Sequence, residues 1–161
     1  LLGLGYPGGP EIDRISLGGN PASVPFPRSY LEPGSLDFSF SGLKTAVLYH
    51  CQDVKGRKGE LNRREVADIS ASFQEAVVDV LVNKTLLALK RHRVGGVILG
   101  GGVSCNSRLR ERFSQALGEI PVKLYCPSPT LCTDNAAMVA SLGYYKYLER
   151  NFATLEVEAV A

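Results

Sequence analysis

The sequence contains no apolar run of about 18 residues, the length that a helix needs to cross a bilayer. Its N-terminal stretch lacks the charged and apolar regions of a secretory signal, so we expect a cytoplasmic protein without a membrane partner. The net charge is only +2, which is too small to indicate nucleic-acid binding by itself. With 161 residues, the chain is long enough to bury the core of one globular domain.

Residues that commonly hold metals are sparse and scattered. No Cys-x-x-Cys pair is present, which argues against a zinc knuckle or a thioredoxin-like site. We expect reduced, structural thiols; disulfides are the weaker alternative, because nothing else in the chain indicates secretion. The two histidines lie far apart in predicted helices and are not expected to bind a metal or to act in catalysis. These residues are Cys51, Cys105, Cys126, Cys132, His50 and His92.

The first part of the chain differs in composition from the rest. Residues 1–37 are rich in glycine and proline and contain several turn signals, so we predict an irregular linker or wrap. Helical spacing of apolar residues then predicts a helix from Ser41 to about Val54. A capping box formed by Asn62 and Glu65, followed by an apolar stripe, predicts a long helix over residues 63–92.

Two short β-branched runs follow, at residues 94–99 and 122–126. We predict that the first is a strand buried on both faces and that the two strands are parallel, because a helix separates them. That helix is expected to begin at Asn106 or Ser107 and to stop at Gly118. A last helix is expected from near Thr133 to about Arg150. Two strands make a thin sheet, so we expect this chain to form part of a larger domain.

Small polar residues and glycines follow both predicted strands, where ligands bind in parallel sheets. Gly100-Gly101-Gly102 and Thr133-Asp134-Asn135 are therefore expected to border one crevice. Each feature also has a structural interpretation: the glycines form a tight turn, and Asn106 and Asp134 stabilise helix N-termini. Lys44 either binds an anion or is an ordinary surface charge. The residues alone leave these alternatives open.

Four segments, in this order, resemble the C-terminal half of the tRNA threonylcarbamoyladenosine transferase family (TsaD), formerly described as O-sialoglycoprotein endopeptidase or glycoprotease. The resemblance covers nearly the whole chain and implies an α/β fold: a helix-rich, partial ribonuclease-H-like lobe of the actin-like (sugar kinase) ATPase fold, with few strands. Between the irregular linker or wrap at 1–37 and a tail at 151–161, the lobe that it implies covers residues 38–150. The segments are Gly5-Tyr6-Pro7-Gly8-Gly9-Pro10, Asp37-Phe38-Ser39-Phe40-Ser41-Gly42-Leu43-Lys44-Thr45, Gly101-Gly102-Val103-Ser104-Cys105-Asn106-Ser107-Arg108-Leu109-Arg110 and Cys132-Thr133-Asp134-Asn135-Ala136-Ala137-Met138.

The resemblance also implies an activity. The family transfers the threonylcarbamoyl group of threonylcarbamoyl-adenylate to adenosine 37 of tRNA, together with other subunits of a complex. Gly9 and Asn106 match positions that bind the adenylate, and Asp13 matches a ribose-contacting position of some members. Asp134 matches a ligand of a divalent metal, iron or zinc. An adenylate or ATP is the implied nucleotide ligand.

The family's other metal ligands, two histidines in a His-x-x-x-His motif, and its phosphate-binding Ser-Gly-Gly-His loop match nothing in this sequence. We therefore expect an incomplete metal site, no autonomous catalysis and possible self-association. The alternative is a non-catalytic adenine-nucleotide-binding or assembly module of the actin-like ATPase class. A metallopeptidase is a remote alternative, because the chain has no His-Glu-x-x-His motif.

Overall fold

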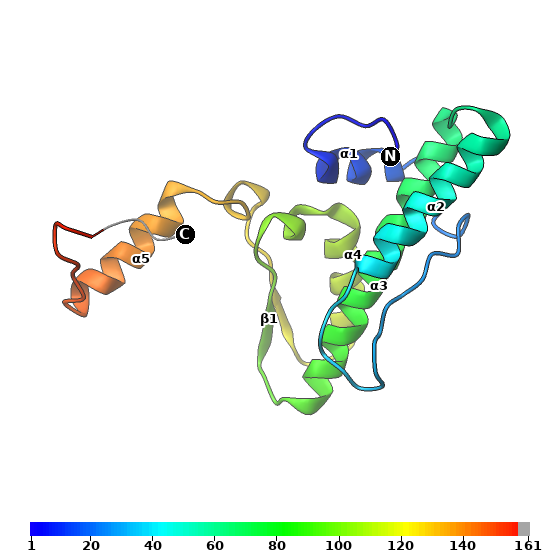
Figure 1. Cartoon of the computed structure of the whole chain (residues 1–161). Helices are drawn as coiled ribbons and strands as arrows, with labels where there is room; N and C mark the ends of the chain where they lie inside the picture. The colour runs from blue at the N-terminus through cyan, green and yellow to red at the C-terminus, as the bar shows by residue number, and fades with distance from the viewer. Residues whose placement is uncertain (158–161) are drawn as a thin grey trace.

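A computed structural model describes residues 1–157 of the chain (Figure 1). The fold is a helix-rich α/β arrangement with one small parallel sheet, as the sequence predicts. In chain order the elements are α1 (Gly8–Ser16), α2 (Ser41–Lys58), α3 (Arg63–Arg91), β1 (Gly96–Ile98), the short 3-10 turn η1 (Gly102–Cys105), α4 (Ser107–Leu117), β2 (Lys123–Tyr125), the turn η2 (Pro129–Leu131) and α5 (Ala136–Leu148).

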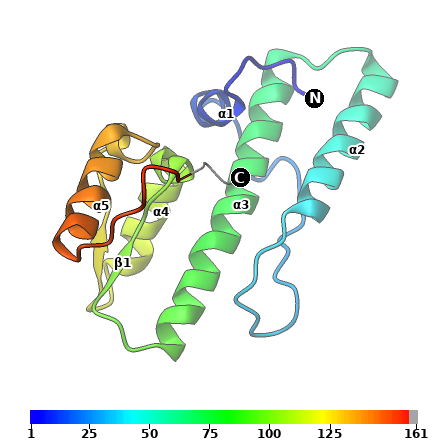
Figure 2. The ribbon, with the colours of Figure 1, turned by 60° about the vertical axis from the view of Figure 1, so that its left-hand side comes forward.

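Helix α3 is the centre of the fold, with α2 on one side and α4 on the other (Figure 2). The predicted capping box is confirmed: Asn62 Oδ1 accepts from the Glu65 N–H at 2.9 Å, and Glu65 Oε2 accepts from the Asn62 N–H at 3.0 Å. One apolar cluster joins α3 to α2 and to the N-terminal segment, including Leu43, Val47, Cys51 and Ile69. A second joins α3 to α4 and the sheet, including Val78, Val82, Leu109 and Phe113.

The two strands are parallel, as predicted, with Val97 opposite Leu124. The expectation that the first strand is buried on both faces is wrong. Val97 packs against the apolar cluster of α4, whereas Ile98 points to the other face and is 78% exposed. Side chains alternate along a strand, and α4 covers only one face of this sheet. The other face is therefore open among the described residues.

The predicted irregular course of residues 1–37 is wrong for α1. Glycines and prolines at 7–10 were interpreted as a turn, but they form the first turn of a helix. Proline is tolerated there, because the first backbone N–H groups of a helix have no partner within it. Helix α1 packs on α3. The boundaries of the predicted linker, lobe and tail stay a prediction.

Residues 17–40 contain no helix or strand and run along α3, fastened by side chains of that helix. Ser72 Oγ accepts from the Val24 N–H at 3.1 Å, and Asp79 pairs with Arg28. Lys84 is only 3% exposed and donates to the carbonyl groups of Tyr30, Ser35 and Asp37. Irregular backbone groups that lack a strand partner are thus satisfied by α3.

Helix α5 stands apart from the rest of the chain (Figure 1). It begins at Ala136, three residues later than predicted, because Asn135 is the cap: its Oδ1 accepts from the Met138 N–H at 3.2 Å. None of its residues is buried. No helix in residues 1–157 combines the length and apolarity needed to cross a membrane. Of the predicted tail, residues 158–161 lie outside the described residues.

Candidate functional site

Asp13 and Asn106, for which the family resemblance implies substrate binding, lie in direct contact. Asp13 is on α1, and its carboxylate faces the N-terminus of α4. Asp13 Oδ1 accepts from Asn106 Nδ2 at 3.1 Å and from Ser107 Oγ at 2.8 Å, and Oδ2 accepts from the Ser107 N–H at 3.1 Å. A carboxylate is stabilised at this end of a helix by the N–H groups and the helix dipole. The site therefore joins residues that are 93 positions apart.

The structure shows one of the two roles that the sequence left open for Asn106, the cap of α4, and its contact with a nucleotide stays a prediction. The cap is confirmed, since Asn106 Oδ1 accepts from the Leu109 N–H at 2.9 Å. The other end of the same amide faces the protein, because Nδ2 donates to Asp13 and, at 2.7 Å, to Gln74 Oε1. The side chain is half-buried. Its geometry is thus fixed on three sides by the fold.

Gly9 lies one helical turn before Asp13, so the two residues share a face of α1. A Cβ built on Gly9 would meet no atom within 4 Å, and the backbone here is open to a close approach. The neighbouring Gly8 lines an apolar cavity of about 710 Å³ together with Phe40, Ser41 and Lys44. The first two motif segments of the sequence thus meet at one cavity. The ligand of this cavity and the role of Lys44 stay untested.

The glycine loop after β1 and the loop before α5 lie side by side, as predicted. Arg110 joins them, since its guanidinium donates to the Ser104 carbonyl at 2.5 Å and to the Pro127 carbonyl at 2.8 Å. A Cβ built on Gly102 would lie 3.9 Å from Thr133 Cγ2. The backbone of Gly101 has a φ of +83°, which favours glycine. These loops border one surface at the carboxyl ends of the strands.

Cys132 anchors the second of these loops. Its side chain is buried, and its sulfur accepts from Arg110 at 3.2 Å. The Ser104 side chain and the Arg110 guanidinium lower the pKa of the Cys132 thiol. Burial and the neighbouring Cys132 raise the pKa of the Cys105 thiol. The cysteines of the described residues are free, in agreement with the expected reduced thiols.

Asp134 is exposed and follows Thr133, which lies beside Gly102. The neighbouring Asn135, not Asp134, provides the cap of α5, so the structural interpretation of Asp134 as a cap is wrong. No hydrogen bond or ion pair joins its carboxylate to another residue in the range 1–157. This range also contains no group of three or more histidine, cysteine, aspartate or glutamate side chains that could hold a metal ion.

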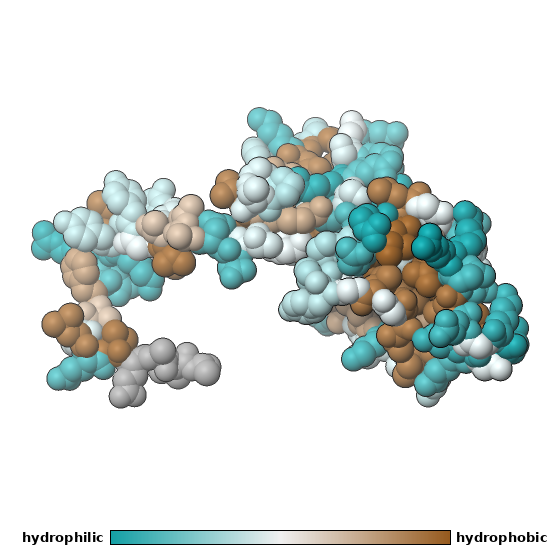
Figure 3. All heavy atoms as spheres, turned by 90° about the horizontal axis from the view of Figure 1, so that it is seen from above, coloured by the Kyte–Doolittle hydropathy of each residue, from teal (hydrophilic) through white to brown (hydrophobic). Residues whose placement is uncertain are grey.

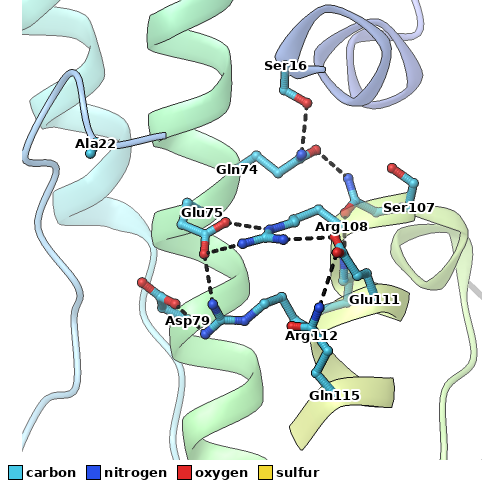
Figure 4. A network of polar contacts seen from close by, with 12 residues as sticks. Ser16, Ala22, Gln74, Glu75, Asp79, Ser107, Arg108, Glu111, Arg112 and Gln115 are labelled. Atoms are coloured by element: carbon cyan, nitrogen blue, oxygen red, sulfur yellow. Dashed lines mark hydrogen bonds and ion pairs between the residues drawn. The ribbon is translucent and has the colours of Figure 1, made fainter. Parts of the chain in front are cut away.

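An ion-pair network lies beside the contact between Asp13 and Asn106 and holds α4 to α3 (Figure 4). Glu75 of α3 accepts from Arg108 at 2.7 Å and from Arg112 at 3.1 Å, and Arg112 also pairs with Asp79. The hydrogen bond from Arg108, with the nearby guanidinium charges, holds the pKa of Glu75 below its usual value. Because Arg108 follows the cap of α4 by two residues, the network fixes the place of that cap.

Reasoning from the sequence missed the supporting residues Ser16, Gln74 and Ser107. A glutamine within the apolar pattern of a long helix was a usable signal, because buried polar side chains need specific partners. Gln74 is 8% exposed. The partners themselves lie 32 and 58 positions away, which no local pattern could indicate.

Comparisons with known proteins give consistent matches. A family model described as TsaD, tRNA N6-adenosine threonylcarbamoyltransferase, matches residues 1–141. A protein named tRNA N6-adenosine threonylcarbamoyltransferase from Desulfitobacterium hafniense is 52% identical over 159 residues, which are 99% of this chain and 46% of that protein. A protein of the same name from Moorella thermoacetica is 48% identical over 160 residues, again 99% of this chain and 46% of the relative. The chain thus spans about half the length of the curated relatives that it matches.

Proposed function

Because the chain belongs to the TsaD family of tRNA N6-adenosine threonylcarbamoyltransferases, we propose that it is part of an enzyme that transfers threonylcarbamoyl from threonylcarbamoyl-adenylate to adenosine 37 of tRNA. The observation that carries this proposal beyond the family is the contact between Asp13 and Asn106, with Gly9 on the same face of α1. The wider actin-like ATPase fold, and an interaction with tRNA and with other subunits, form part of the same proposal.

In this proposal the chain binds the nucleoside part of the adenylate. A ribose offers two hydroxyl donors, and the Asp13 carboxylate offers acceptors at the open end of α4. The backbone at Gly9 leaves room for the ligand, since no side chain projects there. Buried apolar surface with a few oriented polar groups is the usual composition of a small-ligand site. Binding of the nucleoside therefore needs only residues that this chain brings together.

Residues 1–157 do not make up a metal site by themselves. A hard or borderline cation needs several donors, and Asp134 is a single exposed carboxylate. We propose Asp134 as one ligand of a divalent iron or zinc ion, on the grounds that its carboxylate has no structural partner among residues 1–157.

One observation favours a second candidate, a non-catalytic adenine-nucleotide-binding module. Asp13 and Asn106 are in contact between α1 and α4, whereas Asp134 has no fellow metal ligands among residues 1–157. Nucleotide binding without transfer would need only the first group. The two candidates differ in whether the bound adenylate reacts.

The test combines binding with a transfer assay on this chain. AMP is titrated into the 15N-labelled protein at millimolar concentration, and we expect weak binding with shifts at Asp13, Asn106 and Ser107. Asp13→Asn should weaken binding about tenfold, because a charged hydrogen bond is lost. The control is Asp53→Asn, at an exposed ion pair of α2. Absence of any AMP response at these residues would contradict the proposed nucleoside site.

The transfer assay adds threonylcarbamoyl-adenylate, iron or zinc, and unmodified tRNA to the purified chain. We expect no modified tRNA, because catalysis needs all groups to be positioned at once and the metal site is incomplete. Rapid modification by the chain alone would show that this assignment of roles is wrong. Transfer that appears only after other components are added would favour the enzyme over the non-catalytic module.

A further inference from the structure

Gln74 is a buried polar side chain in the middle of the longest helix, with only 8% of it exposed. Its amide bridges two other elements (Figure 4): Nε2 donates to Ser16 Oγ of α1 at 2.8 Å, and Oε1 accepts from Asn106 Nδ2 at 2.7 Å. Burying an amide costs free energy unless its hydrogen bonds are made. An apolar residue of similar size would fill the same space without this requirement. The amide therefore calls for a role beyond packing.

The cap of α4 determines the direction of the hydrogen bonds. The Leu109 N–H can only donate, so the Asn106 atom that faces it is the oxygen Oδ1. Nδ2 therefore faces Gln74, which presents Oε1 to it and turns Nε2 toward Ser16. The Ser16 hydroxyl accepts from Gln74 and donates to the Asp13 carbonyl at 2.8 Å. The Leu109 N–H thus sets the direction of each hydrogen bond from Asn106 through Gln74 and Ser16 to the backbone of α1.

Both N–H groups of the Asn106 amide are used in this series. One donates to Gln74 Oε1, and the other donates to Asp13 Oδ1 at 3.1 Å. Of the two lone pairs on Asn106 Oδ1, the Leu109 N–H uses one. The remaining capacity of the amide is one acceptor position on Oδ1.

We propose that Gln74 is a positioning residue of the nucleoside site: it engages a donor of Asn106, so that Asn106 meets the ligand as an acceptor. This inference rests on the proposed function, because it takes the ligand to be an adenylate. The ribose hydroxyls and the exocyclic amine of adenine are the donors that such a ligand offers. Gln74 itself bonds to Asn106 and Ser16 and acts through Asn106.

The test follows the side-chain amide of Asn106 by NMR in the 15N-asparagine-labelled chain. Gln74→Leu removes both hydrogen bonds, and we expect the Asn106 Nδ2 protons to exchange with water about tenfold faster. Gln74→Glu keeps an oxygen facing Asn106 and should retain most of the protection. The matched control is Gln115→Leu on α4, where the glutamine is exposed and donates only to Glu111.

AMP affinity of the same variants tests the functional part. Gln74→Leu should weaken AMP binding severalfold, Gln74→Glu should restore it, and Gln74→Leu should have no further effect in an Asn106→Ala background. Equal effects of Gln74→Leu with and without Asn106 would overturn the proposal. So would unchanged exchange at Asn106 in a folded Gln74→Leu protein.

Ser16→Ala tests the orienting role of Gln74 if Gln74→Leu does not fold. It removes the partner of Gln74 Nε2 at the margin of the core, and exchange at Asn106 should rise about two- to threefold; unchanged exchange would overturn the proposal. The two measurements also distinguish a failure of the proposed function from a failure of this inference. Altered exchange at Asn106, with no response of the wild-type protein to AMP, would contradict the nucleoside site and support the orienting role.

Discussion

The helices α4 and α5 are similar in length and carry the same kind of cap, yet their surroundings differ. Phe113 of α4 is 3% exposed, and Leu142 of α5 is 59% exposed. Helix α4 is held by an apolar cluster and by ion pairs with α3, whereas α5 carries apolar residues on a separate arm (Figure 3). Local sequence thus specifies both helices, and within residues 1–157 tertiary packing buries side chains of α4 but none of α5. The expected self-association of such exposed apolar surface stays a prediction.

The two helices should differ most in how much stability is lost when one apolar side chain is shortened to alanine. Phe113→Ala should lower the free energy of unfolding by about 3–5 kcal/mol, because it leaves a cavity in the cluster between α3 and α4. Leu142→Ala should change it by less than about 0.5 kcal/mol, because that side chain is mostly exposed. Urea denaturation followed by circular dichroism measures both. Equal losses would mean that α5 is part of the same cooperative unit.

A smaller effect is expected from the ion pairs. Glu75→Gln should lower stability at pH 7 by about 1–2 kcal/mol, since the arginine partners remain about one third exposed and water screens them. Because the pKa of folded Glu75 is lowered, its contribution is complete above the ordinary value of 4.5 and is lost as the pH falls below it.

Urea midpoints measured between pH 7 and pH 3 check this prediction. Glu75→Gln should reduce the loss of stability in the acidic range. The control Glu149→Gln lies at the end of the α5 arm and should leave the profile unchanged. An identical acid profile for the wild type and Glu75→Gln would contradict the role of the network.

The two capping asparagines give a third comparison. Asn62→Ala should cost about 1 kcal/mol of global stability, because it removes the capping box of the central helix. Asn135→Ala should leave the urea midpoint unchanged and should only reduce the helicity of α5. Amide hydrogen exchange, resolved by residue, separates these outcomes. A global loss from Asn135→Ala would show that the arm is coupled to the rest of the chain.

The smallest effect is expected at Asp134. Asp134→Ala should change stability by less than about 0.5 kcal/mol, because its carboxylate makes no bond with another described residue. Because we propose Asp134 as a metal ligand, Asp134→Ala should also lose the weak zinc binding of the wild-type chain. Calorimetry with zinc measures this loss. Asn135→Ala is the adjacent control and should keep that binding. Unchanged zinc affinity in Asp134→Ala would contradict the ligand assignment.

Patterns within one element predicted much of the fold. The capping box at Asn62, the long helix and the parallel pairing of the two strands are confirmed. Helix α1 was missed because proline and glycine have the same local signature in a turn and in the first turn of a helix. The open face of β1 was missed because a strand's composition does not reveal how many helices cover its sheet.

Some residues of the candidate site could likewise be predicted from the sequence, and others could not. Asp13 and Asn106 are found through the family resemblance, and the structure places them in contact. Gln74 and the pairing of Glu75 with Arg108 depend on how α3 meets α4 across 33 positions of sequence. Such partners are set by packing geometry, which no periodicity in one segment records. Whether the predicted residues bind an adenylate stays a prediction.

The double use of Asn106 restricts the chemistry that position 106 can tolerate. The position needs an oxygen for the Leu109 N–H and two donors, for Asp13 and Gln74. Aspartate supplies the oxygen without the donors, serine has a single proton, and glutamine carries its amide on a longer stem. Asparagine alone has an acceptor and a pair of donors at this reach. The contacts within the protein therefore select asparagine, and a scan of all substitutions at this position should find a single optimum of stability.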